Sequence, residues 1–210
     1  MLGDLSKNYE VGYYGTCGTI SSGDGDSGGK SYGLYQLSSA SGTLNDFIDW
    51  LQDKNTDIYT RLNECKSKDF DTEWKAIADE YCDDFCQLQH DYIKDTIYNT
   101  AVTYLKENYF DLNNHYETMK DVVWSRAVQY GAGNIVEMFE EAAEALGYPN
   151  LSYVDDKNFD IDMIESIYLN ICKSEEWTSG APSLREGLYS RFNNECKDAL
   201  DEIHYEIKSE

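Results

Sequence analysis

The sequence predicts a mainly α fold (α+β) with one small sheet. Two observations lead to this fold class. From about residue 43 onward, apolar side chains recur every three or four residues, which is the period of an α-helix. Before that point, residues 15–30 are rich in glycine, serine and aspartate, and a short tyrosine-rich run follows them. Two prolines in 210 residues and a hydrophobic content of 41% favour one packed domain, residues 1–210, with room for two lobes.

The first fifth of the chain is expected to contain little regular structure. A short helix is predicted for residues 5–10, and residues 15–30 are predicted to form a loop. Residues 31–38 alternate loosely between apolar and polar side chains, which predicts a short strand. Thr43 is the candidate N-cap of the first long helix, because a threonine hydroxyl can accept a free backbone N–H there.

Six apolar stripes predict the helices that follow. Asp71 or Thr72 is the candidate cap of the second helix, which is expected to continue, with a bend, to about Tyr109. A Gly-Ala-Gly step separates the third and fourth helices, and Gly147 is expected to end the fourth. The stripes cover residues 47–62, 74–93, 119–130, 134–146, 161–171 and 184–207.

The charge of the chain excludes some classes of partner. There are 40 acidic and 17 basic residues, which gives a formal net charge of −23. Such a chain is not expected to bind nucleic acid or an anionic membrane, because both interactions require an excess of lysine and arginine. No apolar run approaches the roughly 20 residues that cross a bilayer, so no membrane insertion is predicted. The first residues also lack the basic and apolar regions of a secretory signal peptide.

The six cysteines are predicted to be free thiols in a reducing compartment. They are scattered along the chain, and only Cys82 and Cys86 share a helix face through a spacing of four residues. A zinc site would need a second cysteine pair or nearby histidines at ligand spacing, and the sequence has neither. We therefore predict no metal and no cofactor.

Three carboxylates near the start of the chain have the order that glycosidic bond cleavage requires. One protonated carboxyl group must protonate the leaving oxygen, and a second carboxylate must activate water. Glu10 is the candidate acid, because its apolar neighbours Val11 and Tyr13 favour a protonated carboxyl group. Asp24 or Asp26 is the candidate base, since the surrounding glycines would leave that loop open to water and substrate. A wide gap between acid and base would invert the anomeric carbon.

A resemblance to a known family rests on these residues and on the run that follows them. Residues 21–29 read Ser-Ser-Gly-Asp-Gly-Asp-Ser-Gly-Gly, and residues 31–37 read Ser-Tyr-Gly-Leu-Tyr-Gln-Leu. With Glu10 upstream, the chain resembles the chitosanase-like branch of the lysozyme-like superfamily, which occurs in phage endolysins, tail-associated lysins and secretion-spike proteins. Three later blocks, which are individually weaker, add to the resemblance: residues 85–93, 123–131 and 187–192.

The resemblance implies a fold and a site. The fold would be lysozyme-like, with a helical large lobe and a small β-containing lobe on either side of a cleft. Glu10 would be the acid, Asp26 the base in preference to Asp24, and Ser31 would position the water. Relatives often use threonine in place of Ser31, and the Glu-to-Asp spacing differs from that of chitosanases proper. The residues implied to bind substrate are Asp24, Tyr32, Tyr35, Gln36 and Gln129.

The resemblance also implies a biological role. The chain would be a peptidoglycan hydrolase that cleaves the glycan β-1,4 bond, as bacteriolytic phage endolysins do. Its partner would be the bacterial cell-wall glycan, reached with the help of an additional cell-wall-binding domain. It would stay in the host cytoplasm until release to the wall, or belong to a virion or a secretion apparatus. The alternatives are a chitosanase-type glycosidase, a lytic transglycosylase, and a non-catalytic glycan-binding module on the same fold.

Two other motifs in the glycine-rich loop are set aside. Residues 25–29 match the nucleophile motif of trypsin-like serine proteases, but all three histidines lie downstream, in predicted helices. A calcium-binding EF-hand loop that starts at Asp24 would place Gly29 correctly at its sixth position. Its twelfth position would be Tyr35, where the loop needs a bidentate glutamate.

Overall fold

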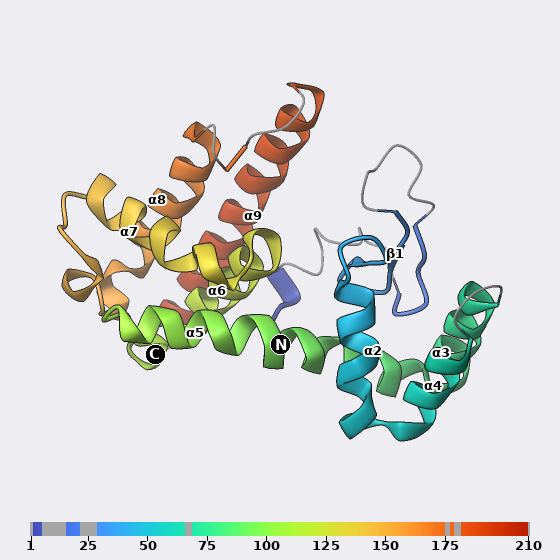
Figure 1. The fold of residues 1–210 in the computed structure, drawn as a ribbon. Helices are drawn as coiled ribbons and strands as arrows, with labels where there is room; N and C mark the ends of the chain where they lie inside the picture. The colour runs from blue at the N-terminus through green and yellow to red at the C-terminus, as the bar shows by residue number, and fades with distance from the viewer. Residues whose placement is uncertain are drawn as a thin grey trace. The chain divides into compact units, whose positions relative to one another are not determined.

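The described residues of the computed structural model form two compact units (Figure 1). We call residues 10–96 the hairpin unit, and residues 1–9 together with 97–210 the helical unit. The described part of the chain is mainly helical and contains one two-stranded sheet, which confirms the predicted fold class at this level. The structure describes residues 2–5, 16–21, 29–65, 69–174, 177–178 and 182–209, without the side chains of residues 182–184.

The described residues of the hairpin unit form a β-hairpin and three α-helices. Residues 6–10 of the predicted helix, and residues 15 and 22–28 of the predicted loop, lie outside the described residues. The elements are β1 (Ser31–Tyr32), β2 (Leu37–Ser38), α2 (Thr43–Lys54), α3 (Thr56–Glu64) and α4 (Phe70–Ile93), followed by the π-helical turn η1 (Lys94–Tyr98).

The single strand predicted for residues 31–38 is wrong, because this segment folds back on itself. The strands β1 and β2 pair antiparallel, with Tyr32 opposite Leu37. Between them, Gly33 has φ +74° and Gln36 has φ +53°. These left-handed conformations reverse the chain direction, and alternation of side chains alone does not reveal them.

Aromatic side chains form the core of the hairpin unit. Phe47, Trp74 and Phe85 come from α2 and α4, and none of them has exposed surface. The rings of Trp74 and Phe85 meet edge to face, with centroids 4.9 Å apart and an interplanar angle of 67°. Tyr92 meets Phe47 in the same way at 5.3 Å. This packing holds α4 against α2, while α3 packs on both.

The helix starts in this unit differ from the predicted ones. Gly42, with φ +93°, precedes α2, and the predicted cap Thr43 instead accepts a hydrogen bond from the backbone N–H of Ser38. The predicted stripe at residues 47–62 is divided between α2 and α3 at Asn55. The Asn55 side chain caps α3 by accepting the N–H of Ile58 at 3.1 Å.

The long helix predicted after residue 70 is confirmed, but it has irregular points. It begins after Asp69, and the predicted cap Asp71 lies within its first turn, where it binds other partners. Inside α4, Cys82 has φ 27° and ψ −97°, which is not helical. The chain continues through η1 into α5 (Asn99–Glu107), close to the expected end at Tyr109. The expected bend region therefore contains a kink and a π-helical turn.

The helical unit contains the remaining helices, and its helix positions agree with the predicted stripes. Gly131 (φ +84°) ends α6, and Gly147 (φ +91°) follows α7, as the sequence predicts. The elements besides α5 are η2 (Leu112–Asn114), α6 (Glu117–Tyr130), η3 (Ala132–Asn134), α7 (Ile135–Ala145), η4 (Leu151–Tyr153), η5 (Lys157–Phe159), α8 (Asp160–Lys173) and α9 (Pro182–Ser209).

The core of the helical unit is apolar but encloses several polar groups. The helix α7 packs against α5 and α8, and α9 packs against α6 and α8. Trp124 and Arg126 on α6 have no exposed surface. Within the described part of the chain, no helix is both long and apolar enough to cross a membrane.

Candidate functional site

The predicted catalytic carboxylates Glu10, Asp24 and Asp26 lie outside the described residues. The structure does describe the backbone between and after them, namely residues 16–21 and the hairpin that begins at Ser31. The geometry of this framework is therefore the starting point for the site.

Residues 16–21 are fixed to α4 through one backbone carbonyl. The Cys17 carbonyl oxygen accepts a hydrogen bond from Trp74 Nε1 at 2.8 Å and another from Gln89 Nε2 at 3.0 Å. The same Gln89 accepts the backbone N–H of Leu34 with its Oε1 at 2.9 Å. Because Gln89 has no exposed surface, its amide satisfies both neighbours in place of water. One buried side chain thus connects residues 16–21, the hairpin turn and α4.

The hairpin turn comes so close to this amide that only glycine fits. A Cβ on Gly33 would lie 2.1 Å from Gln89 Oε1, far inside van der Waals contact. Sequence reasoning missed Gln89, although a signal exists. It lies four residues from both Phe85 and Ile93, so it occupies a buried stripe where a polar side chain needs partners.

The first hairpin strand meets the start of α4 through a cluster of polar groups. Tyr32 Oη donates to Asp71 Oδ1 at 2.8 Å, and Lys30 Nζ lies 2.5 Å from Asp71 Oδ2. The ammonium group of Lys30 lowers the pKa of Asp71. Burial, together with the Asp71 carboxylate, raises the pKa of Tyr32 above its usual range. Tyr32 is therefore a neutral hydrogen-bond donor at every physiological pH.

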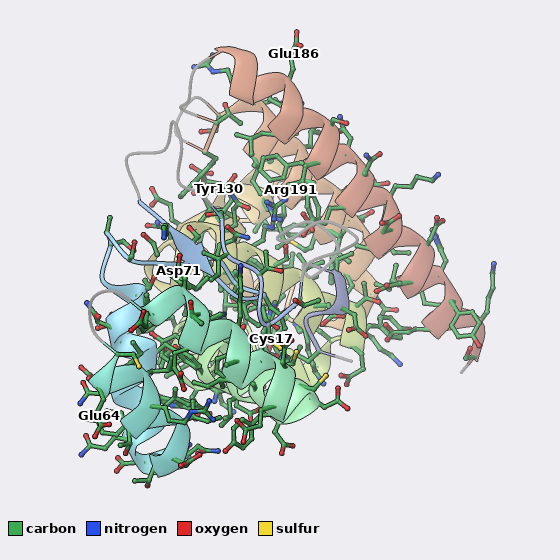
Figure 2. The ribbon with its side chains drawn as sticks, turned by 90° about the vertical axis from the view of Figure 1, so that its right-hand side faces the viewer. Cys17, Glu64, Asp71, Tyr130, Glu186 and Arg191 are labelled. Carbon is green, nitrogen blue, oxygen red and sulfur yellow. The ribbon has the colours of Figure 1, made fainter. Side chains whose placement is uncertain are left out.

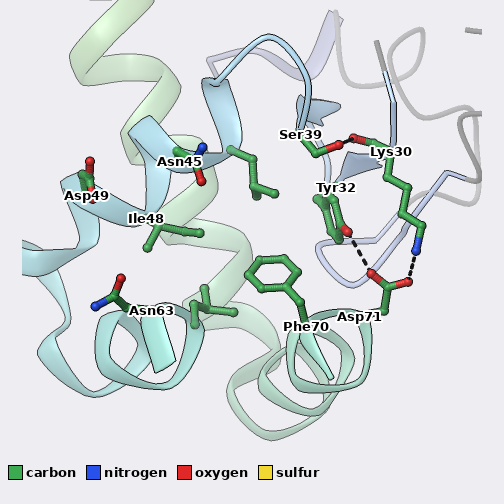
Figure 3. Close-up of a pocket in the computed structure, with 11 residues that line it drawn as sticks. Lys30, Tyr32, Ser39, Asn45, Ile48, Asp49, Asn63, Phe70 and Asp71 are labelled. Atoms are coloured by element: carbon green, nitrogen blue, oxygen red, sulfur yellow. Dashed lines mark hydrogen bonds and ion pairs between the residues drawn. The ribbon is translucent and has the colours of Figure 1, made fainter. Parts of the chain in front are cut away.

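A pocket of about 680 Å³ opens beside this cluster, and we call it the hairpin pocket (Figure 3). It combines aromatic and aliphatic surface with amide, hydroxyl and charged groups. Phe70 lies in the middle of these side chains in the close-up view, below Tyr32. Ligand sites commonly combine apolar walls with a few polar groups in this way. The lining residues are Lys30, Tyr32, Ser39, Leu44, Asn45, Ile48, Asp49, Leu62, Asn63, Phe70 and Asp71.

The other predicted site residues of the hairpin unit have separate environments. Ser31 is half-buried, and its backbone N–H donates to Ser21 Oγ at 3.1 Å. Tyr35 is 9% exposed, and its hydroxyl pairs with His90 Nδ1 at 2.9 Å. Gln36 is half-buried in the turn. The structure therefore brings Ser31 and Tyr32 together on β1 and directs Tyr35 to a different part of α4.

Gln129, the remaining predicted site residue, belongs to the helical unit. It is half-buried on α6, and its Oε1 has no hydrogen-bond partner among the described residues. On the preceding turn, the guanidinium of Arg126 donates to Glu195 Oε2 at 2.8 Å and to Ser125 Oγ at 2.9 Å. Both charged side chains are fully buried. Arg191, labelled in Figure 2, adds a second cation 3.8 Å from the same Glu195 oxygen.

A second group of hydrogen-bonded polar side chains in the helical unit surrounds His115. Its Nδ1 lies 2.5 Å from Asp160 Oδ1, and its Nε2 lies 3.1 Å from Asp155 Oδ1. The imidazole ring stacks on Phe110 with centroids 4.0 Å apart. The Asp160 carboxylate also accepts the backbone N–H of Tyr116 at 2.8 Å. This group joins the segment before α6 to the start of α8. Within the described ranges, no group of three or more histidine, cysteine, aspartate or glutamate side chains is placed to hold a metal ion.

Comparison with known proteins identifies the family. The family model described as "Type VI secretion system spike protein VgrG3-like, C-terminal" matches residues 2–196. The chain belongs to this family. It is also similar to the type VI secretion system spike protein VgrG3 of Vibrio cholerae serotype O1, with 32% identity over 200 residues. That match covers 95% of this chain and 18% of the relative, so the chain spans less than a fifth of the length of that curated protein.

This finding corrects the family and the role inferred from the motifs. The predicted assignment to the lysozyme-like, chitosanase-like branch is wrong, because the matching family is that of a secretion-spike C-terminal region. The predicted role of a phage endolysin that hydrolyses peptidoglycan is wrong for the same reason. Short Gly-Asp-rich runs are common turn chemistry, so they carry little family information.

The partner inferred from the motifs is corrected in the same way. Cell-wall peptidoglycan and an additional wall-binding domain were predicted from the motif resemblance, and that resemblance is overturned by the match to a secretion-spike family. The secretion-apparatus alternative for the location agrees with the family. Membership in the family is compatible with an enzymatic domain.

Proposed function

We propose that this chain is a domain carried by a type VI secretion spike and exported with it. The observation that supports the proposal is the family match, which extends over residues 2–196. The described fold has no helix that would hold such a domain in a membrane during transfer. Its partners would be the other components of the secretion apparatus and the effectors that travel with the spike.

Export is tested in the native bacterium with the full-length protein carrying a small epitope tag. The protein should be found in the medium when the apparatus is intact and be retained in cells when the apparatus is inactivated. A cytoplasmic marker protein controls for lysis. Equal amounts in the medium of both strains would contradict the proposal.

We further propose that the domain is an enzyme, a glycoside hydrolase, with lobes and a cleft of lysozyme type. The support is the order of carboxylates, with Glu10 followed by two aspartates on a glycine-rich loop. The described framework around them adds to it. Residues 16–21 lie between these carboxylates in sequence and are hydrogen-bonded to α4, which would limit their movement. Preorganised carboxylates are what acid–base catalysis requires.

The proposed roles follow from this order. Glu10 protonates the leaving oxygen, Asp26 activates the water, and Ser31 positions that water. Sugar would be bound by Asp24 together with the hydrogen-bonding and aromatic groups of the hairpin strands. The hairpin pocket supports this role for Tyr32, which lines it, since amides, hydroxyl groups and aromatic rings suit a polar ligand that has apolar faces. The further proposed substrate-binding residues are Tyr32, Tyr35, Gln36 and Gln129.

The choice between the two aspartates is tested with Asp24→Asn and Asp26→Asn. Each variant is assayed for release of reducing ends from soluble oligosaccharides of defined linkage. Loss of the base should lower kcat by at least about 100-fold, whereas loss of a substrate contact should mainly raise KM. The proposal requires the kcat loss in Asp26→Asn. The opposite result would transfer the role of base to Asp24.

A further inference from the structure

Three of the six cysteines meet in the hairpin unit. Cys17 Sγ donates to the carbonyl oxygen of Cys82 at 3.5 Å and is hydrogen-bonded to the thiol of Cys86. Cys82 and Cys86 are one helical turn apart on α4. All six cysteines are free thiols in this structure. To form a disulfide, two sulfurs in hydrogen-bond contact must approach to about 2 Å.

The helix α4 is distorted at Cys82, the residue whose carbonyl oxygen contacts the thiol of Cys17. Cys82 has φ 27°, a left-handed value that costs free energy for any residue other than glycine. The carbonyl oxygen of Cys82, at this kink, accepts a hydrogen bond from the thiol of Cys17 at 3.5 Å. The thiol of Cys17 therefore contacts α4 at its kink.

The backbone of Cys17 is held in place independently of its thiol. Its carbonyl oxygen has two donors, Trp74 and Gln89, both buried. The side chain of Cys17 is also buried, whereas Cys86 is half-exposed. The hydrogen bond with Cys86, together with burial, raises the pKa of Cys17. An oxidant from solution therefore meets Cys86 before Cys17.

We propose that Cys17 and Cys86 are a disulfide-forming pair that a small-molecule disulfide oxidises. The Cys86 thiolate attacks the oxidant and forms a mixed disulfide, which releases one thiol. Cys17 then loses its proton to water and attacks Cys86 Sγ, which releases the second thiol. In balance, two cysteine thiols and one disulfide give one protein disulfide and two small thiols.

The bond would join residues 16–21 covalently to α4. These residues lie between Glu10 and Asp26 in sequence, so the bond would fix the segment that connects the two proposed catalytic groups. Disulfides persist in oxidising compartments and are rare in the reducing cytosol. The pair would accordingly be reduced before export and oxidised after it, a consequence that rests on the proposed function. The chemical test uses purified protein and does not depend on export.

The test compares the purified chain in reduced glutathione and in oxidised glutathione. After alkylation of free thiols and non-reducing digestion, mass spectrometry should find the peptides of Cys17 and Cys86 joined, with the loss of two hydrogens. The midpoint of thermal unfolding should rise by about 10 °C, because a loop of roughly 70 residues is closed. A lasting glutathione adduct on Cys86, or a bond of either cysteine to Cys82, would overturn the proposal.

Two variants separate the bond from other effects of oxidation. Cys86→Ser should lose the entire rise in the unfolding midpoint, while its midpoint in reduced glutathione stays within a few degrees of the wild type. Cys65→Ser, a half-buried cysteine of the same unit, should keep the full rise. A rise that survives in Cys86→Ser, or that disappears in Cys65→Ser, would assign the effect to another thiol.

Discussion

The two units place different kinds of polar groups in their cores. In the hairpin unit, the buried polar contacts are neutral: an amide, an indole N–H and a backbone carbonyl meet at Gln89, Trp74 and Cys17. In the helical unit they include the charged pair of Arg126 and Glu195 and the contact of Asp160 with His115. Neutral groups cost little to bury when they are hydrogen-bonded, whereas a buried charge that loses its partner is strongly destabilising.

This difference matches the kind of structure that the polar contacts hold in each unit. The neutral contacts fix short irregular segments, which have few apolar side chains to bury, and they do so through directed hydrogen bonds. The charged contacts join helices that are already held by apolar packing. Removal of one charge leaves its partner buried and unpaired, which destabilises that packing. Substitutions should therefore damage the helical unit most when they remove a charge, and the hairpin unit most when they remove space or a hydrogen bond.

The largest effect is expected for Glu195→Gln. The substitution keeps the volume of the side chain but leaves the guanidinium of Arg126 buried without its carboxylate. We expect a loss of about 3–5 kcal/mol in the free energy of unfolding, measured by urea denaturation. Glu186→Gln is the matched control, because Glu186 lies exposed on the same helix and points away from the protein in Figure 2. A loss under about 1 kcal/mol in Glu195→Gln would contradict the comparison.

Next in size is Gly33→Ala, compared with Gly131→Ala. Both glycines have positive φ, +74° and +84°, so alanine is strained at either position. Only at Gly33 would the new Cβ also meet Gln89, while nothing lies within 4 Å at Gly131. We expect a loss of about 3 kcal/mol for Gly33→Ala and about 1 kcal/mol for Gly131→Ala by thermal or urea unfolding. Equal losses would show that the hairpin turn has room to move away from α4.

A smaller effect is expected for Gln89→Leu. Leucine fills a similar volume but leaves the N–H of Leu34 without an acceptor and the carbonyl of Cys17 with one donor in place of two. We expect a loss of about 2 kcal/mol and faster amide hydrogen exchange at Leu34. Gln87→Ala, two residues earlier on the exposed side of α4, should change stability by less than about 0.5 kcal/mol. Unchanged exchange at Leu34 would refute the proposed connection.

The smallest effect on stability is expected for Asp121, a carboxylate that is protonated at mildly acidic pH. Burial, with the nearby charges of Glu202 and Asp4, raises the pKa of Asp121 to about 6. This pKa lies above the unfolded value, so the folded state favours the protonated carboxyl group. The contribution of Asp121 to the free energy of unfolding is therefore full below about pH 4 and is lost as the pH rises through 6. Asp121→Asn keeps an acceptor for the N–H of Gly3 and should be more stable than the wild type at pH 7, by about 1 kcal/mol.

The pH prediction is checked by the unfolding midpoints of both proteins at pH 4, 5, 6 and 7. The gap between them should open between pH 4 and pH 6. Asp53→Asn, at an exposed position of α2, serves as the control and should follow the wild type throughout. A constant gap from pH 4 to pH 7 would mean that Asp121 does not titrate in this range.

The same contrast explains what the sequence could predict. Helices α6 to α9 follow from the spacing of apolar residues, because burial of one helix face is a local, periodic property. The hairpin depends on positive φ at Gly33 and Gln36, and the division between α2 and α3 depends on the cap at Asn55. The hairpin turn and the division between the helices leave the spacing of apolar residues unchanged, so that spacing does not predict them.

The site was harder to predict than the fold, for a related reason. Tyr32 and Asp71 were noted separately, one as a sugar contact and the other as a helix cap, yet they are hydrogen-bonded across 39 positions of sequence. Cys82 and Gln89 also both contact Cys17, which is more than 60 residues away from either of them. Such pairings are properties of the tertiary structure and leave no periodic trace.

The most direct test of the account separates chemistry from stability. The wild type, Glu10→Gln and Glu195→Gln are assayed for release of reducing ends from soluble oligosaccharides, well below the unfolding midpoint of each protein. We predict release by the wild type, a loss of at least about 100-fold in Glu10→Gln with no change in its unfolding midpoint, and nearly normal activity in folded Glu195→Gln. No release by the wild type, or equal release by Glu10→Gln, would contradict the proposal that the hairpin unit contains the catalytic groups of a glycoside hydrolase.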